Sequence, residues 1–316
     1  MTFAARATPH FAANAECVAC PYSTPCVTVP PGKQKGHRIT ADSALDCIYR
    51  GLAPDGSVRQ ILDMLQEQVR TAADARYGGG TGDKLTGGLA NVRGDWLEQV
   101  LGLLLWNIVA DSHFGNTAIV KLPNATILPF LGLYSPQAQG YLEDLFASLK
   151  TQDISLTMSN PDFVCVTNLP EEIAASFRTP LKMGKEAAST MASAWELLRG
   201  ICDPFSVPFV LAVKSSIRPD RRYQIVHEAN TVKALVAHLA SRYWDKDLYT
   251  AFYALIADTV SDQDRMVLRN PATHTLVQVA WTPAPVVDGV LELDSVSEAS
   301  ADMIKLITRH VAPITS

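Results

Sequence analysis

The sequence predicts an α/β fold in which a central mixed β-sheet is flanked by helices. Short β-rich or apolar runs recur along the chain, and segments of helix length separate successive runs, an alternation typical of a sheet covered by helices. The chain has 316 residues, of which 47% are hydrophobic and 19% are charged. This composition provides for a large buried core and argues against disorder.

The first third is expected to combine an irregular arm with two long helices. Prolines interrupt residues 1–55, so we expect an N-terminal arm there and a single domain over residues 56–316. Apolar residues at helical spacing predict a helix from Ser57 to Arg76. A second helix, from about Asn91 to Asp111, is apolar on most faces and is expected to be central. The glycine-rich segment 78–88 fits neither a P-loop nor a dinucleotide-binding pattern, which predicts a flexible loop.

The remaining two thirds are expected to alternate between strands and helices. The predicted strands are residues 117–122, 126–131, 162–167, 209–214 and 275–281. The predicted helices are residues 137–149, 170–177, 186–199, 224–240, 248–258 and 299–310. A polar loop is expected over residues 261–273.

Charge and hydropathy narrow the class of protein. The longest apolar stretch, Val100 to Ala110, is too short to span a bilayer, and no secretory signal is evident, so we expect a soluble cytoplasmic protein. The net charge of −5 goes against a simple nucleic-acid-binding protein. That objection is limited, because binding depends on the local field in a cleft and because a metal ion neutralises carboxylates at a nuclease site.

The N-terminal cysteines leave two interpretations open. Cys17, Cys20 and Cys26, with His37 or Cys47 as a fourth ligand, have side chains suited to zinc. The irregular spacing after Cys20 favours the other interpretation, reduced thiols in an extended arm. Disulfides are not expected without an export signal.

The most informative stretch is FVLAVKSSIRPDRRYQIVHEAN, residues 209–230. Its apolar run ends on Lys214, and a charged cluster follows, formed by Arg218, Asp220, Arg221 and Arg222. Glu228 comes fourteen positions after Lys214, inside a helical pattern. In-line cleavage of a phosphodiester needs Mg²⁺ on hard oxygen ligands and a cation near the attacking water. Asp162, at the head of a predicted strand, and Lys214, at the end of another, would face one metal-sized space if the two strands pair.

These residues resemble the PD-(D/E)XK nuclease superfamily, whose fold centres on a mixed sheet that carries the motif. The superfamily usually has an acid two positions before the lysine, where this chain has Ala212. The segment from Lys214 to Arg221, with Gln224 and Glu228, resembles the signature of the CCGG-family type II restriction endonucleases, the NgoMIV and SgrAI group. In that family the second metal-binding acid lies on a helix after the lysine strand, and Glu228 matches its position.

The resemblance implies a role for each member of the site. Asp162 and Glu228 would bind Mg²⁺, and Lys214 would orient or activate the attacking water. Glu98, in a Gly-Asp-Trp-Leu-Glu segment that resembles a further family motif, would contribute through a second metal ion or a water molecule. Taken singly, each has a simpler explanation. For Glu98, the alternative is an acid on the helix surface or a partner for Arg93 or Arg76. For Glu228, it is an ion pair with Lys233 or Arg222. For Lys214, it is the solvated end of a buried strand.

The charged cluster is suited to G·C base pairs. Arginine donates two hydrogen bonds to guanine O6 and N7, and a carboxylate accepts from the cytosine amino group. By the resemblance, Arg218, Asp220 and Arg221 contact the CC/GG steps in the major groove. An internal Arg–Asp cluster that stabilises the loop is the alternative. Arg222 is expected to contact phosphate, and Gln224 to support the loop or to contact a base.

The outer base pairs would be recognised by other elements. The candidates are Lys84 with Thr86 in the glycine-rich segment, the basic run 33–38, and the loop 262–269; an ordinary solvated loop explains each as well. Because each active site cuts one strand of a palindrome, the expected assembly is a homodimer, and some family members form tetramers.

The sequence therefore predicts a bacterial Mg²⁺-dependent type II restriction endonuclease. Its expected substrate is duplex DNA with a palindromic CCGG or CCNGG core, and its products carry 5′-phosphates. Two alternatives stay open: a PD-(D/E)XK nuclease of repair that recognises DNA structure, and a DNA-binding protein that does not cut.

Overall fold

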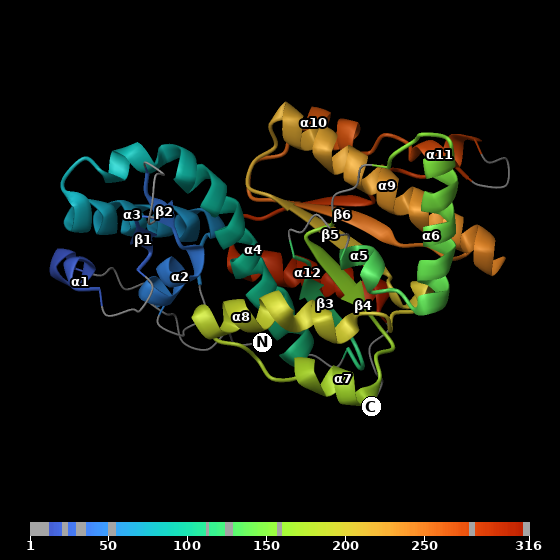
Figure 1. Ribbon diagram of the computed structural model, residues 1–316, viewed down its shortest axis with the longest axis horizontal. Helices are drawn as coiled ribbons and strands as arrows, with labels where there is room; N and C mark the ends of the chain where they lie inside the picture. The colour runs from blue at the N-terminus through green and yellow to red at the C-terminus, as the bar shows by residue number, and fades with distance from the viewer. Residues whose placement is uncertain are drawn as a thin grey trace.

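The structure, a computed structural model, describes residues 13–20, 25–29, 36–49, 55–111, 114–123, 129–156, 160–277 and 282–311. A helical N-terminal lobe lies beside a larger lobe built on a five-stranded sheet (Figure 1). Helix α4 (Thr86–Asp111) runs from the first lobe into the second and packs against both. In the described part of the chain, no helix is long and apolar enough to cross a membrane.

The N-terminal lobe is more regular than its prolines suggest. Its elements are α1 (Asn14–Val18), β1 (Val27–Thr28), β2 (Arg38–Ile39), α2 (Ala41–Tyr49), α3 (Val58–Tyr77) and the 3₁₀ helix η1 (Gly82–Leu85). Helix α3 begins where predicted, after the N-cap Ser57, and buries one apolar face. The prediction of an irregular arm up to residue 55 is wrong over α2, whose buried face includes Leu45 and Ile48. The predicted glycine-rich loop is also partly helical, because η1 and the start of α4 lie within it.

The central sheet is mixed, as predicted, and its strands occur in chain order. They are β3 (Ala118–Lys121), β4 (Phe163–Val166), β5 (Phe209–Lys214), β6 (Ala251–Ile256) and β7 (Gly289–Glu292). Strands β3, β4 and β5 pair antiparallel, whereas β5, β6 and β7 pair parallel. Every residue of β5 and β6 is buried, which is expected of central strands covered on both faces.

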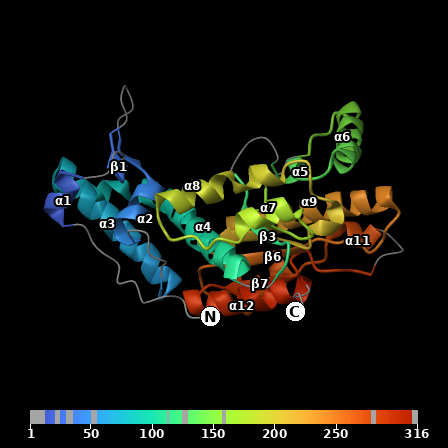
Figure 2. The same cartoon turned by 90° about the horizontal axis from the view of Figure 1, so that it is seen from below.

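Helices surround this sheet. The long ones are α6 (Pro136–Thr151), α9 (Pro219–Tyr243) and α12 (Val296–His310). The short ones are α5 (Pro129–Gly132), α7 (Glu171–Ala174), η2 (Ala175–Phe177), α8 (Lys185–Ser193), η3 (Ala194–Leu198), η4 (Pro204–Ser206), α10 (Asp262–Leu268) and α11 (Thr273–Val277). Figure 2 shows α9 and α12 on opposite sides of the sheet. Helix α9 forms the connection between the parallel strands β5 and β6, and it packs against β6, α6, α10 and α11.

Several predicted elements after residue 120 need correction. The helix predicted at 248–258 is strand β6, because a fully buried apolar run has no alternation that separates strand from helix. The polar loop 261–273 contains α10, which begins at a capping box formed by Ser261 and Asp264. The strand predicted at 275–281 is helical up to Val277, and residues 278–281 lie outside the described residues. The strand predicted at 126–131 is helix α5 from Pro129 onward, with residues 124–128 outside the described part.

One difference in bounds affects the site directly. Helix α9 begins at Pro219, five residues earlier than predicted, with Arg218 as its N-cap residue and proline in the first turn. Asp220, Arg221 and Arg222 therefore lie on the first turn of a helix and not in a loop.

Candidate active site

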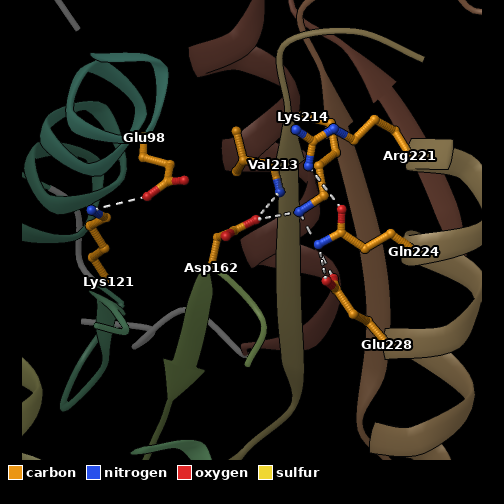
Figure 3. A network of polar contacts seen from close by, with 8 residues as sticks. All are labelled: Glu98, Lys121, Asp162, Val213, Lys214, Arg221, Gln224 and Glu228. Atoms are coloured by element: carbon orange, nitrogen blue, oxygen red, sulfur yellow. Dashed lines mark hydrogen bonds and ion pairs between the residues drawn. The ribbon is translucent and has the colours of Figure 1, made fainter. Parts of the chain in front are cut away.

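Asp162, Lys214 and Glu228 meet at one edge of the sheet (Figure 3). Lys214 is the last residue of β5, and Asp162 directly precedes the neighbouring antiparallel strand β4. The Lys214 Nζ atom lies 3.3 Å from Asp162 Oδ2 and 3.9 Å from Glu228 Oε2. The backbone N–H of Val213 also donates to Asp162 Oδ2. The end of β5, the start of β4 and helix α9 thus bring two carboxylates close to one ammonium group.

All three side chains are buried, so their charges interact strongly. Glu228 is 2% exposed, and Asp162 and Lys214 are each 9% exposed. Burial acts to lower the pKa of Lys214, but the carboxylates of Asp162 and Glu228 more than offset it, and the pKa is raised. Lys214 is therefore a protonated cation at neutral pH.

Ala212 stands at the strand position where the sequence resemblance leads one to expect an acid. This residue is fully buried and pairs with Ala254 of β6, so the strand position that usually carries the superfamily acid is part of the core. Ala212 and Lys214 point to the same face of β5, because side chains alternate along a strand. Glu228 approaches the Lys214 ammonium from α9 and supplies the carboxylate that this face of β5 lacks.

Glu98 lies at the same edge of the sheet, on α4, and pairs with a second lysine. Its Oε2 atom is 3.0 Å from the Nζ atom of Lys121, the last residue of β3 (Figure 3). Burial and the neighbouring Asp162 carboxylate raise the pKa of Glu98, although Lys121 acts to lower it. Lys121 was missed from the sequence. Like Lys214, it ends an apolar strand, and this was the available signal.

Three of the four simpler partners suggested for these acids form ion pairs elsewhere. Arg93 pairs with Asp63 at 2.9 Å. Lys233 pairs with Asp288 at 2.8 Å, and Arg222 with Asp264 of α10 at 2.7 Å. The expected phosphate contact of Arg222 would therefore have to compete with an ion pair that fixes α10 to α9.

The predicted base-contacting residues lie at the start of α9, close to the acids. Arg218 and Asp220 are about two-thirds exposed, and their ion pair is 3.4 Å long. Arg221 Nε is 3.9 Å from the same Asp220 carboxylate, and Arg221 Nη1 donates to Gln224 Oε1 at 2.9 Å. The two exposed ion pairs with Asp220 contribute little to stability, so they can be exchanged for other partners at low cost.

The remaining predicted side chains have less connection to the acids. Lys84 is exposed on η1, which packs against α3 and α4. Of the basic run 33–38, residues 33–35 lie outside the described residues, and His37 packs against Tyr77 in a tilted ring contact with centroids 4.7 Å apart. The loop 262–269 is mostly helix α10.

The structure shows which groups suit a metal ion. Among the described residues, no group of three or more His, Cys, Asp or Glu side chains is arranged to hold one, whether among the N-terminal cysteines or among the acids of the site. Cys17, Cys20 and Cys26 are all free thiols. Asp162 and Glu228 form a pair of hard oxygen donors that converge on the cationic Lys214, and Mg²⁺ commonly takes one or two carboxylates and keeps several waters. The donor set therefore fits Mg²⁺.

Comparison with known proteins identifies the family. The sequence pattern of the family described as Cfr10I/Bse634I restriction endonuclease matches residues 38–309. The chain belongs to this family. It is thus a type II restriction endonuclease, an enzyme of the site-specific deoxyribonuclease class.

Individual members of the Cfr10I/Bse634I family are similar over most of their length. The type II restriction enzyme Cfr10I of Citrobacter freundii is 26% identical over 282 residues, which cover 87% of this chain and 97% of that enzyme. The crystal structure of the type IIF restriction endonuclease Bse634I with cognate DNA gives a TM-score of 0.80 at 29% identity, covering 90% of this chain and 98% of the other. A second Bse634I structure gives 0.81 at 30% identity, covering 90% and 97%.

Proposed function

We propose that this restriction endonuclease uses Mg²⁺ to cut both strands of a palindromic duplex with a CCGG or CCNGG core. The convergence of Asp162 and Glu228 on Lys214, beside the base-contacting cluster at the start of α9, carries the proposal. The Lys214-to-Glu228 segment, which resembles the NgoMIV and SgrAI group, supports the CCGG-type core. The DNA-bound Bse634I relative supports duplex DNA as the partner.

Asp162 and Glu228 would hold the ion, and Glu98 would contribute through a second ion or a water molecule. A bound Mg²⁺ supplies Lewis-acid stabilisation of the charge that develops on the phosphate. Lys214 is a cation at neutral pH because its pKa is raised. Lys214 lies beside both acids, where it would orient or activate the attacking water and stabilise negative charge. Hydrolysis leaves a 5′-phosphate and a 3′-hydroxyl end.

Arg218, Asp220 and Arg221 would contact the G·C pairs in the major groove. Their ion pairs within the cluster are exposed and at least 3.4 Å long, so little is lost when guanine and cytosine replace the internal partners. Two copies of the chain related by a two-fold axis would present two such clusters to the two halves of a palindrome. A homodimer, or a tetramer built from it, satisfies this geometry.

Digestion of phage DNA in the presence of Mg²⁺ tests the proposal. We expect discrete fragments whose ends, once sequenced, share a CCGG or CCNGG core and carry 5′-phosphates. A smear would instead indicate a nuclease that recognises DNA structure. Binding to DNA without any cleavage would indicate a protein that has lost the activity of its family.

A further inference from the structure

A chain of side-chain hydrogen bonds on α9 connects the exposed arginine cluster to the buried acid. Arg221 Nη1 donates to Gln224 Oε1 at 2.9 Å, and Gln224 Nε2 donates to Glu228 Oε1 at 2.9 Å (Figure 3). The three residues are spaced by three and four positions, so they lie along one face of the helix. Glu228 continues the chain to Lys214, since its other carboxylate oxygen faces the ammonium group at 3.9 Å.

The two ends of this chain lie in different environments. The Arg221 side chain is 42% exposed, whereas Glu228 is 2% exposed. Gln224 is half-buried between them. The chain therefore connects an exposed guanidinium, through one amide, to a carboxylate that lies inside the protein.

The amide of Gln224 can make this connection because it carries both an acceptor and a donor. A guanidinium group has donors and no acceptor, and an ionised carboxylate has acceptors and no donor. The bridging group must accept from Arg221 and donate to Glu228 at the same time, which fixes the orientation of the Gln224 amide. Methionine has similar length and helix propensity. Its thioether has no donor for Glu228 and is only a weak acceptor for Arg221.

We propose that Gln224 is a positioning residue that couples base recognition by Arg221 to the orientation of Glu228. The inference rests on the proposed function. Gln224 occupies a single Nη1 donor of Arg221, and the other guanidinium donors stay available for guanine O6 and N7. A cognate guanine keeps the guanidinium in place, and with it the amide and the carboxylate. A wrong base draws the guanidinium away, so Glu228 loses its fixed orientation.

Single-turnover cleavage by Gln224→Met tests the coupling. We expect the cognate site, mapped from phage fragments, to be cut about 10–100-fold more slowly, the usual loss when a residue that orients a metal ligand is removed. Duplex affinity measured without Mg²⁺ should stay within about two-fold of wild type, and the Mg²⁺ concentration for half-maximal rate should rise. Gln137→Met is the matched control, since Gln137 also bonds a side chain four positions on, Tyr141, on exposed α6.

A double-mutant cycle with Arg221→Ala gives the second measurement. If the two residues act through one chain, the double variant cuts no more slowly than the slower single variant. Independent, multiplying losses would overturn the coupling. So would a Gln224→Met rate within two-fold of wild type, or a loss of affinity that accounts for the whole loss of rate, which would make Gln224 a direct DNA contact. In each case wild type still cuts, so the proposed function stands; failure of wild type to cut any DNA would overturn both.

Discussion

At the scale of single residues, the site balances acids against lysines. Asp162 and Glu228 face Lys214, and Glu98 faces Lys121. Each acid is buried, and buried carboxylates without a cation nearby would be costly. The lysines thus offset part of the cost of burying these carboxylates close together.

Glu98→Gln tests this balance through the pH dependence of stability. The pKa of Glu98 is raised in the folded protein, so the neutral carboxyl is favoured there. The contribution of Glu98 to the free energy of unfolding is complete below the unfolded-state pKa of about 4.3. That contribution is lost as pH rises through the folded-state pKa. We therefore expect the free energy of unfolding of wild type, relative to Glu98→Gln, to fall from pH 4 upward and then to level off. Urea unfolding of both proteins between about pH 4 and pH 8 measures this difference.

Glu143→Gln, on the exposed side of α6, is the control for removal of a surface carboxylate. A wild-type stability that rises with pH relative to Glu98→Gln would contradict the account. It would mean that the attraction of Lys121 outweighs the burial of Glu98.

The sequence pointed to the residues of the candidate site, but it did not reveal every contact between them. Asp162, Lys214 and Glu228 follow from strand ends and from a family-like spacing of fourteen positions, and the structure brings all three together. The Glu98–Lys121 pair depends on α4 packing against β3, which no local pattern in the sequence reveals.

At the scale of elements, the close approach of α4 to the sheet positions Glu98. A Cβ atom on Gly102 of α4 would lie 3.1 Å from Met191 Sδ and 3.2 Å from the ring of Phe163, the first residue of β4. Gly94, on the same helix, has no described atom within 4 Å of the same position. The position of the first glycine is thus tightly packed, and that of the second is open.

Substitution of the two glycines should have opposite effects. Gly102→Val is expected to lower the free energy of unfolding by about 1–3 kcal/mol, the usual cost of overpacking a core. Gly94→Ala is expected to raise it by about 0.5–1 kcal/mol through helix propensity. Urea unfolding measures both. Equal stability of Gly102→Val and wild type would show that α4 can move away from the sheet at no cost.

The elements differ in how far the sequence predicts them. Strand β5 coincides with its prediction, because five apolar residues and Lys214 are bounded by Pro208 and Ser215. Strand β6 was mistaken for a helix, since its identity depends on its parallel pairing with β5. Strand β7 was missed altogether: it is a half-buried edge strand that begins at Gly289, where a Cβ atom would lie 2.9 Å from the ring of Tyr253.

At the scale of the whole molecule, the charge distribution agrees with a local DNA site. The chain carries a net charge of −5, which does not favour binding over its whole surface. The exposed arginines Arg218 and Arg221 lie at the start of α9, the helix that also carries Glu228, so positive charge is presented beside the acids that would hold the metal ion. Affinity then depends on the field at this site and not on net charge.

Asp162→Ala is the most direct test of the proposed active site. Cleavage and specific binding are measured side by side on the recognition site mapped from phage fragments. We expect the variant to protect the same base pairs in a footprint as wild type, because Arg218 and Arg221 are unchanged, and to cut neither strand in Mg²⁺. Cleavage that persists in the variant would contradict the placement of the active site at Asp162, Lys214 and Glu228.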